Sequence, residues 1–100
     1  MEELANVHPG EILQEEFLKP FGITSYRLAK ETNIPITRVS EILRKRRKIT
    51  ADTALRFSAF FGNSAEFWLG IQTEYDLREE RRKIEKEIQN IHRIVEVAVR

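Results

Sequence analysis

The hydrophobic positions between residues 24 and 47 follow the spacing of two short helices joined by a tight turn. The apolar side chains fall on one face of each predicted helix and are Leu28, Ala29, Ile34, Val39 and Ile42. Thr24 suits the start of the first helix because its hydroxyl can cap free backbone N–H groups. Asn33 suits the turn, where a left-handed backbone is often needed, and Pro35 opens the second helix. Because Ala29 is small, the two helices can cross closely and bury one shared face.

Three further helices are predicted around this pair, so the chain is expected to be all-α. The first covers residues 9–18 and is expected to be stopped by Pro20 and Gly22, since the ring and missing N–H of proline disfavour a helix interior. The next covers about residues 50–62, between a capping threonine and a terminating glycine. The last begins after Ser64. Together these segments predict a compact domain of five helices.

The C-terminal segment has a narrower apolar pattern than the five helices. Its apolar residues recur at three-, four- and seven-residue spacing within a run of mixed charge and are Leu77, Ile84, Ile88, Ile91 and Val95. This seam predicts a long helix that docks on another surface. Residues 93–100 are rich in β-branched side chains, and the pattern leaves both helix and strand open there. We therefore divide the chain into a helical domain at residues 1–76 and an extension at residues 77–100.

Charge is distributed unevenly, although the formal net charge of the chain is only +1. Residues 24–50 carry eight basic and two acidic side chains, a local charge of +6. Residues 1–18 carry five glutamates and no lysine or arginine. A basic surface suits phosphates, so the acidic N-terminal face is expected to point away from them.

A short helix, a tight turn and a second helix followed by a basic run form the pattern of a DNA-binding helix-turn-helix. The second helix of this motif enters the major groove of duplex DNA. Its candidate base- or phosphate-contacting side chains are Ile36, Thr37, Arg38, Ser40 and Arg44. Phosphate contacts are expected from the basic side chains Lys45, Arg46 and Arg47. Thr24 and Ser25 can offer a hydroxyl and backbone N–H groups to a further phosphate.

The alternative to this interpretation is an ordinary helical hairpin. Its polar face would be solvated, and Thr24 and Ser25 would serve only as helix caps. The basic run directly after the second helix favours DNA binding, because closely spaced like charges need a compensating partner.

The sequence indicates no catalytic residues, metal site or cofactor. His8 and His92 lie far apart and lack a third ligand at a useful spacing. There is no nucleophile–base pattern and no glycine-rich phosphate loop, so an enzyme is not expected. The absence of cysteine fits a cytoplasmic protein, and no apolar run approaches the length of a membrane span.

Large apolar residues are concentrated in the two helices that follow residue 50. They have the helical spacing of a core, but a domain of this size has difficulty burying so many rings. A two-fold dimer face is therefore expected at Phe60, Phe67, Trp68 and Ile71.

Four stretches of the chain together resemble HigA-type antitoxins of the XRE/Cro-like helix-turn-helix family. The match covers about residues 8–77, and several uncommon combinations occur in the family's order. The first stretch is HPGEIL (8–13) with EFLKP (16–20), and the second is GIT (22–24) with YRLA (26–29). The third is RVSEI (38–42) with RR (46–47) and ITADTALR (49–56), and the fourth is FG (61–62) with SAEFWL (64–69).

This resemblance implies a Cro/lambda-repressor-like homodimer that binds double-stranded operator DNA and represses its own operon. It also implies a HigB-type toxin as partner, a ribonuclease that cuts messenger RNA. Residues 77–100 match no fixed family pattern, and their apolar spacing alone predicts that they dock on the toxin, on the second protomer or back on their own domain. The family's DNA contacts carry over to Thr37, Arg38, Ser40 and Arg44. One departure is Lys45, where the family usually has glycine, and a left-handed backbone there would cost about 1 kcal/mol.

Two other functions agree with the same pattern. A stand-alone XRE-family transcriptional regulator would bind DNA in the same way and have no toxin partner. A protein-binding adaptor on a helix-turn-helix scaffold would show no salt-dependent affinity for DNA. A neighbouring reading frame for a small basic toxin would distinguish the antitoxin from the regulator.

Overall fold

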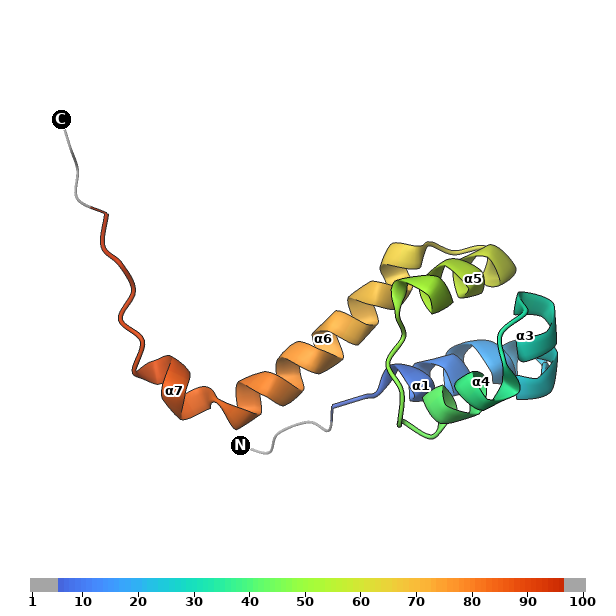
Figure 1. Cartoon of the computed structure of the whole chain (residues 1–100), viewed down its shortest axis with the longest axis horizontal. Coiled ribbons are helices and arrows are strands. Elements are labelled where there is room, and N and C mark those ends of the chain that lie inside the picture. The colour runs from blue at the N-terminus through green and yellow to red at the C-terminus, as the bar shows by residue number, and fades with distance from the viewer. Residues whose placement is uncertain (1–5, 97–100) are drawn as a thin grey trace.

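The computed structural model describes residues 6–96, and every regular element in that range is a helix (Figure 1). In chain order these elements are α1 (Pro9–Ile12), η1 (Leu13–Leu18), α2 (Lys19–Phe21), α3 (Ser25–Thr32), α4 (Ile36–Leu43), α5 (Ala51–Phe61), α6 (Ala65–Lys83) and α7 (Glu85–Gln89). The elements α1 to α5 and the first part of α6 form a compact body, and the rest of α6 leads away from it towards α7. The predicted all-α fold is confirmed.

The first three elements form one helical run that is longer than predicted. The middle element η1 is a π-helix, in which the N–H of Lys19 donates to the carbonyl of Gln14, five residues earlier. Pro20 lies inside this continuous run, directly after the π-helical turn, so the predicted end of the helix at Leu18 is wrong. The run ends at Gly22, whose left-handed backbone has φ of 64°.

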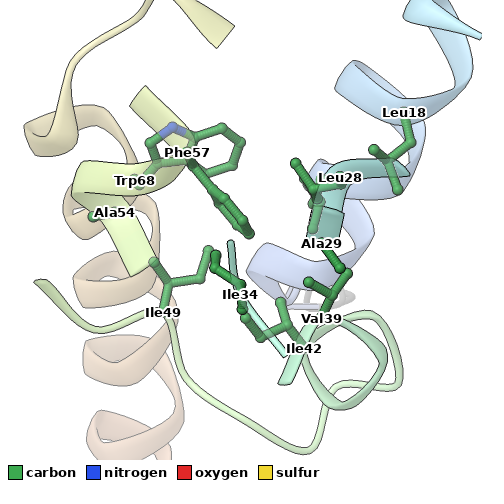
Figure 2. Close-up of a cluster of buried hydrophobic side chains, with 11 residues drawn as sticks. Leu18, Leu28, Ala29, Ile34, Val39, Ile42, Ile49, Ala54, Phe57 and Trp68 are labelled. Atoms are coloured by element: carbon green, nitrogen blue, oxygen red, sulfur yellow. The ribbon is translucent and has the colours of Figure 1, made fainter. Parts of the chain in front are cut away.

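The core lies between α3 and α4 on one side and α5 and α6 on the other (Figure 2). All five apolar residues that predicted the two short helices are buried, which confirms the predicted shared face. Phe57 and Trp68 fill the opposite side, and their ring centroids lie 5.2 Å apart in an edge-to-face arrangement. This core fixes which side of α4 faces solvent.

The start of α1 lies directly against the end of α4. A Cβ atom added at Gly10 would stand 1.9 Å from the carbonyl oxygen of Ile42, so only glycine permits this approach. His8 caps α1 by accepting a hydrogen bond from the Gly10 N–H at 2.9 Å, and its ring packs edge-on against Tyr75 of α6. Burial lowers the pKa of His8, and the nearby Lys45 lowers it further. The His8 ring thus joins α1 to α6, with its Nδ1 serving as a hydrogen-bond acceptor.

The predicted seam helix in the C-terminal extension is interrupted. Helix α6 continues through residues 76 and 77 and ends at Lys83, Ile84 separates it from α7, and residues 91–96 form neither helix nor strand. Residues 97–100, which belong to the segment left open between helix and strand, lie outside the described range. The prediction of one long seam helix is wrong, because a narrow apolar stripe stabilises a helix only when it is packed and this stripe is exposed. The domain boundary after residue 76 stays a prediction.

Candidate nucleic-acid interface

Helices α3 and α4 are joined by a tight left-handed turn, as the sequence predicted. The Thr24 side chain accepts a hydrogen bond from the Arg27 N–H at 3.0 Å and caps α3. Asn33 has φ of 57°, and the Ile34 N–H that follows donates to the Ala29 carbonyl at 3.0 Å. This closed turn fixes the angle at which α4 leaves α3. Since the Thr24 oxygen acts as an acceptor in the cap, its O–H remains a donor for a ligand such as a phosphate.

The outer face of α4 presents most of the predicted base-reading residues together. Ile36 is 41% exposed, although it is a large apolar residue on a polar surface. A shallow hollow of about 200 Å³ runs along this face and is lined by Ile36, Thr37, Ser40, Glu41 and Arg44. It therefore combines an apolar end, two hydroxyl groups and a guanidinium group, which are the side-chain types that contact base edges in the major groove.

Arg38 lies apart from this hollow and is turned towards α5. Its guanidinium donates to Asp52 Oδ1 at 2.8 Å, and its side chain is only 29% exposed. Asp52 also accepts from Arg56 Nε at 2.9 Å, and Arg56 donates to the carbonyl of Thr32 at 3.0 Å. The hydrogen bonds from Arg38 and then Arg56 lower the pKa of Asp52 below its ordinary value. Arg38 thus links α4 to the start of α5, and Arg56 links α5 to the end of α3.

The sequence pattern did not identify Asp52 and Arg56, which hold Arg38 in place beside the α4 face. Their only sequence signal was a four-residue spacing on the predicted helix at 50–62, which indicates an ordinary surface ion pair. The link from Asp52 to Arg38 depends on the packing of α5 beside α4, which local spacing does not encode.

The basic loop after α4 keeps the left-handed backbone that glycine would normally supply. Lys45 has φ of 64°, its N–H donates to the Ile42 carbonyl at 3.0 Å, and the Arg46 N–H donates to the Glu41 carbonyl at 2.8 Å. These two bonds end the helix in a Schellman motif, in which a non-glycine residue costs about 1 kcal/mol. The substitution of lysine for glycine leaves the turn closed.

Three basic side chains after α4 are paired with carboxylates. The ammonium of Lys45 lies 3.2 Å from Glu11, Arg47 pairs with Glu41 at 2.6 Å, and Lys48 pairs with Asp76 at 3.0 Å. The acidic N-terminal face therefore does not point wholly away from the basic loop, as had been expected, because Glu11 of α1 reaches it. Within residues 6–96, Arg44 and Arg46 form no ion pair.

The residues expected at a dimer face differ in accessibility. Trp68 has 0% exposure, and its indole Nε1–H donates to Asn63 Oδ1 at 3.0 Å. It belongs to the core of its own protomer and offers no surface to a second one, so its assignment to the interface is wrong. Phe60 and Ile71 are partly buried, whereas Phe67 is 38% exposed. The interface itself stays a prediction.

Two further features bear on the kind of site present. Among the described residues, no group of three or more histidine, aspartate or glutamate side chains could hold a metal ion. No helix in residues 6–96 is long and apolar enough to cross a membrane.

The all-helical fold and the exposed face of α4 together define a helix-turn-helix protein. The Helix-turn-helix family HTH_3 matches residues 15–68, which include α3, the turn and α4. The chain belongs to this family, within the XRE-type branch that contains the HigA antitoxins, and the resemblance seen in the sequence is confirmed.

Three comparisons support this placement. Virulence-associated protein I of Dichelobacter nodosus is 51% identical over 76 residues, which cover 76% of this chain and 70% of that protein. Antitoxin HigA-1 of Vibrio cholerae is 40% identical over 81 residues, which cover 81% of this chain and 76% of that protein. The structure of Pseudomonas aeruginosa antitoxin HigA with the higBA promoter has a TM-score of 0.86 and 37% identity, and the match covers 91% of this chain and all of that one.

Proposed function

We propose that this protein is an antitoxin that represses its own operon by binding operator DNA through α4. The observation that carries this proposal is the outer face of α4, where one hollow is lined by an apolar residue, two hydroxyls and Arg44, which forms no ion pair within residues 6–96. A basic loop follows directly, and the related Pseudomonas aeruginosa HigA has been solved with its promoter. Such a repressor would act in the cytoplasm.

Each part of the surface has a distinct role in this function. Ile36, Thr37, Ser40 and Arg44 would contact base edges, and Lys45, Arg46 and Arg47 would contact phosphates on either side of the groove. The N-terminus of α3, with Thr24 and Ser25, would hold another phosphate. A two-fold dimer would place two copies of α4 about 34 Å apart on a palindromic site.

The operator proposal is tested by titrating the full chain with duplexes at several salt concentrations. We expect affinity to fall steeply with salt, because each basic side chain that neutralises a phosphate releases about 0.9 counterion. The operator is obtained by selection from a random duplex library, and a scrambled duplex of the same length serves as control. Binding that is independent of salt, or no duplex binding at all, would overturn the proposal.

The toxin proposal is supported by the relation to HigA antitoxins and by the exposed apolar residues after α6. Ile91, Ile94 and Val95 are each more than two-thirds exposed, and a surface this apolar is unusual unless it meets a partner. We expect co-expression with the toxin from the neighbouring reading frame to restore growth and yield a copurifying complex. A chain shortened to residues 1–83 should keep operator binding and lose neutralisation. Full neutralisation by the shortened chain would exclude the tail as the toxin site, and a missing toxin frame would favour the stand-alone regulator.

A further inference from the structure

Three of the five consecutive basic residues after α4 are each held by a carboxylate from a different helix. Lys45 pairs with Glu11 of α1 at 3.2 Å, Arg47 with Glu41 of α4 at 2.6 Å, and Lys48 with Asp76 of α6 at 3.0 Å. We call Glu11, Glu41 and Asp76 the carboxylate set. The local excess of positive charge that the sequence shows is therefore partly neutralised by the fold.

These pairs contribute little to folding. All six side chains lie at the surface, with between 39% and 66% of their area exposed. Exposed ion pairs gain little, because water screens the attraction and both side chains lose rotamer freedom. Their repeated occurrence on one short loop therefore calls for a role other than stability.

The backbones that carry the carboxylate set are held close to the loop. Glu41 stands on α4 itself, and Glu11 follows Gly10, whose backbone touches the end of α4. Asp76 accepts a hydrogen bond from the buried Gln72 at 2.9 Å, and the same Gln72 side chain accepts from the Ile49 N–H at 2.9 Å. Each carboxylate is thus anchored near the loop and competes with any phosphate for the same cation.

We propose that Glu11, Glu41 and Asp76 act as internal competitors for phosphate and thereby weaken binding to non-operator DNA. This inference rests on the proposed operator binding through α4. Non-specific affinity comes almost entirely from phosphate contacts, so a loop whose cations are already paired attracts arbitrary duplex weakly. On the operator, base contacts by α4 hold the basic loop against the DNA backbone. They thereby drive the basic side chains to exchange their carboxylate partners for DNA phosphates. The carboxylate set therefore raises discrimination between operator and other DNA.

The test compares Glu41→Gln and Glu11→Gln with the matched control Glu15→Gln. Glu15 pairs with Lys19 at 3.0 Å on the first helical run, so the control removes the same charge and the same kind of ion pair away from the basic loop. Affinities for operator and scrambled duplexes are measured at several salt concentrations by fluorescence anisotropy. Circular dichroism and thermal unfolding of each variant verify that folding is retained.

We expect Glu41→Gln to raise affinity for the scrambled duplex about three- to tenfold, through the freed cation and the lost repulsion of a charge near the phosphates. The salt slope on that duplex should steepen by about one counterion. The affinity of Glu41→Gln for the operator should rise less, so its discrimination between operator and scrambled duplex falls. Glu11→Gln should change both affinities in the same direction. If both variants match Glu15→Gln on the scrambled duplex, the inference is overturned while operator binding stands. If the unmodified chain binds no duplex, the proposed function itself fails.

Discussion

A Gly10→Ala variant is expected to lose about 3 kcal/mol or more of its free energy of unfolding. The new Cβ would stand 1.9 Å from the Ile42 carbonyl oxygen, and both atoms are fixed by backbone rather than by a flexible side chain. Overpacking of a rigid site typically costs about 1–3 kcal/mol, and a collision between two backbones lies at or above the top of that range. Chemical denaturation followed by circular dichroism measures the loss.

Gly70→Ala provides the matched control for this prediction. Gly70 lies within α6, and no atom outside its own helix stands within 4 Å of an added Cβ. Alanine is the better helix former, so this variant should gain about 0.5–1 kcal/mol. If Gly10→Ala and the unmodified chain unfold at the same denaturant concentration, α1 and α4 are not held as closely as the structure indicates.

An Arg44→Ala variant is expected to lose about 1–3 kcal/mol of operator affinity and to relax discrimination at one base position in each half-site. Arg44 ends the hollow on α4 and has no ion-pair partner among residues 6–96, so its guanidinium is available to a guanine edge. Titration of the operator and of duplexes changed at single base pairs measures both effects.

Arg38→Ala should behave differently from Arg44→Ala, although the two residues were predicted from the sequence as equivalent DNA contacts. Arg38 is engaged by Asp52 at 2.8 Å, so its loss should loosen the contact of α4 with α5 and weaken all duplexes to a similar extent. Arg78→Ala is a suitable control, because Arg78 pairs with Glu74 on α6. A larger loss of discrimination for Arg38→Ala than for Arg44→Ala would show that Arg38 exchanges Asp52 for a base.

The sequence predicted the buried and exposed sides of α3 and α4 correctly, because helical periodicity and caps are local properties. Leu28, Val39 and Ile42 had to share one face, and Asn33 had to turn the chain. The ion pairs on the basic loop could not be predicted in this way. Glu11 and Lys45 are separated by 34 positions and meet only because Gly10 lets α1 touch α4.

Two failed predictions have a related cause. Trp68 was assigned to a dimer face because a small domain was expected to leave some rings uncovered, yet the packing of α5 against α6 encloses it completely. Ile91 and Val95 were assigned to a helix because of their spacing, yet spacing predicts a helix only where a partner surface covers the stripe. In both cases the outcome depends on how far tertiary packing buries the side chain, which the local spacing does not specify.

The position of helix α6 bears on whether the proposed toxin and operator DNA could be bound at the same time. Asp76 still pairs with Lys48 of the basic loop, and beyond it the last seven residues of α6 span about 10 Å and lead the chain away from the body that holds α4 (Figure 1). A toxin seated on that end would not have to displace the duplex, so capture and repression would be concurrent rather than exclusive. The operator would then act as a scaffold on which toxin accumulates in proportion to the number of antitoxin chains assembled there.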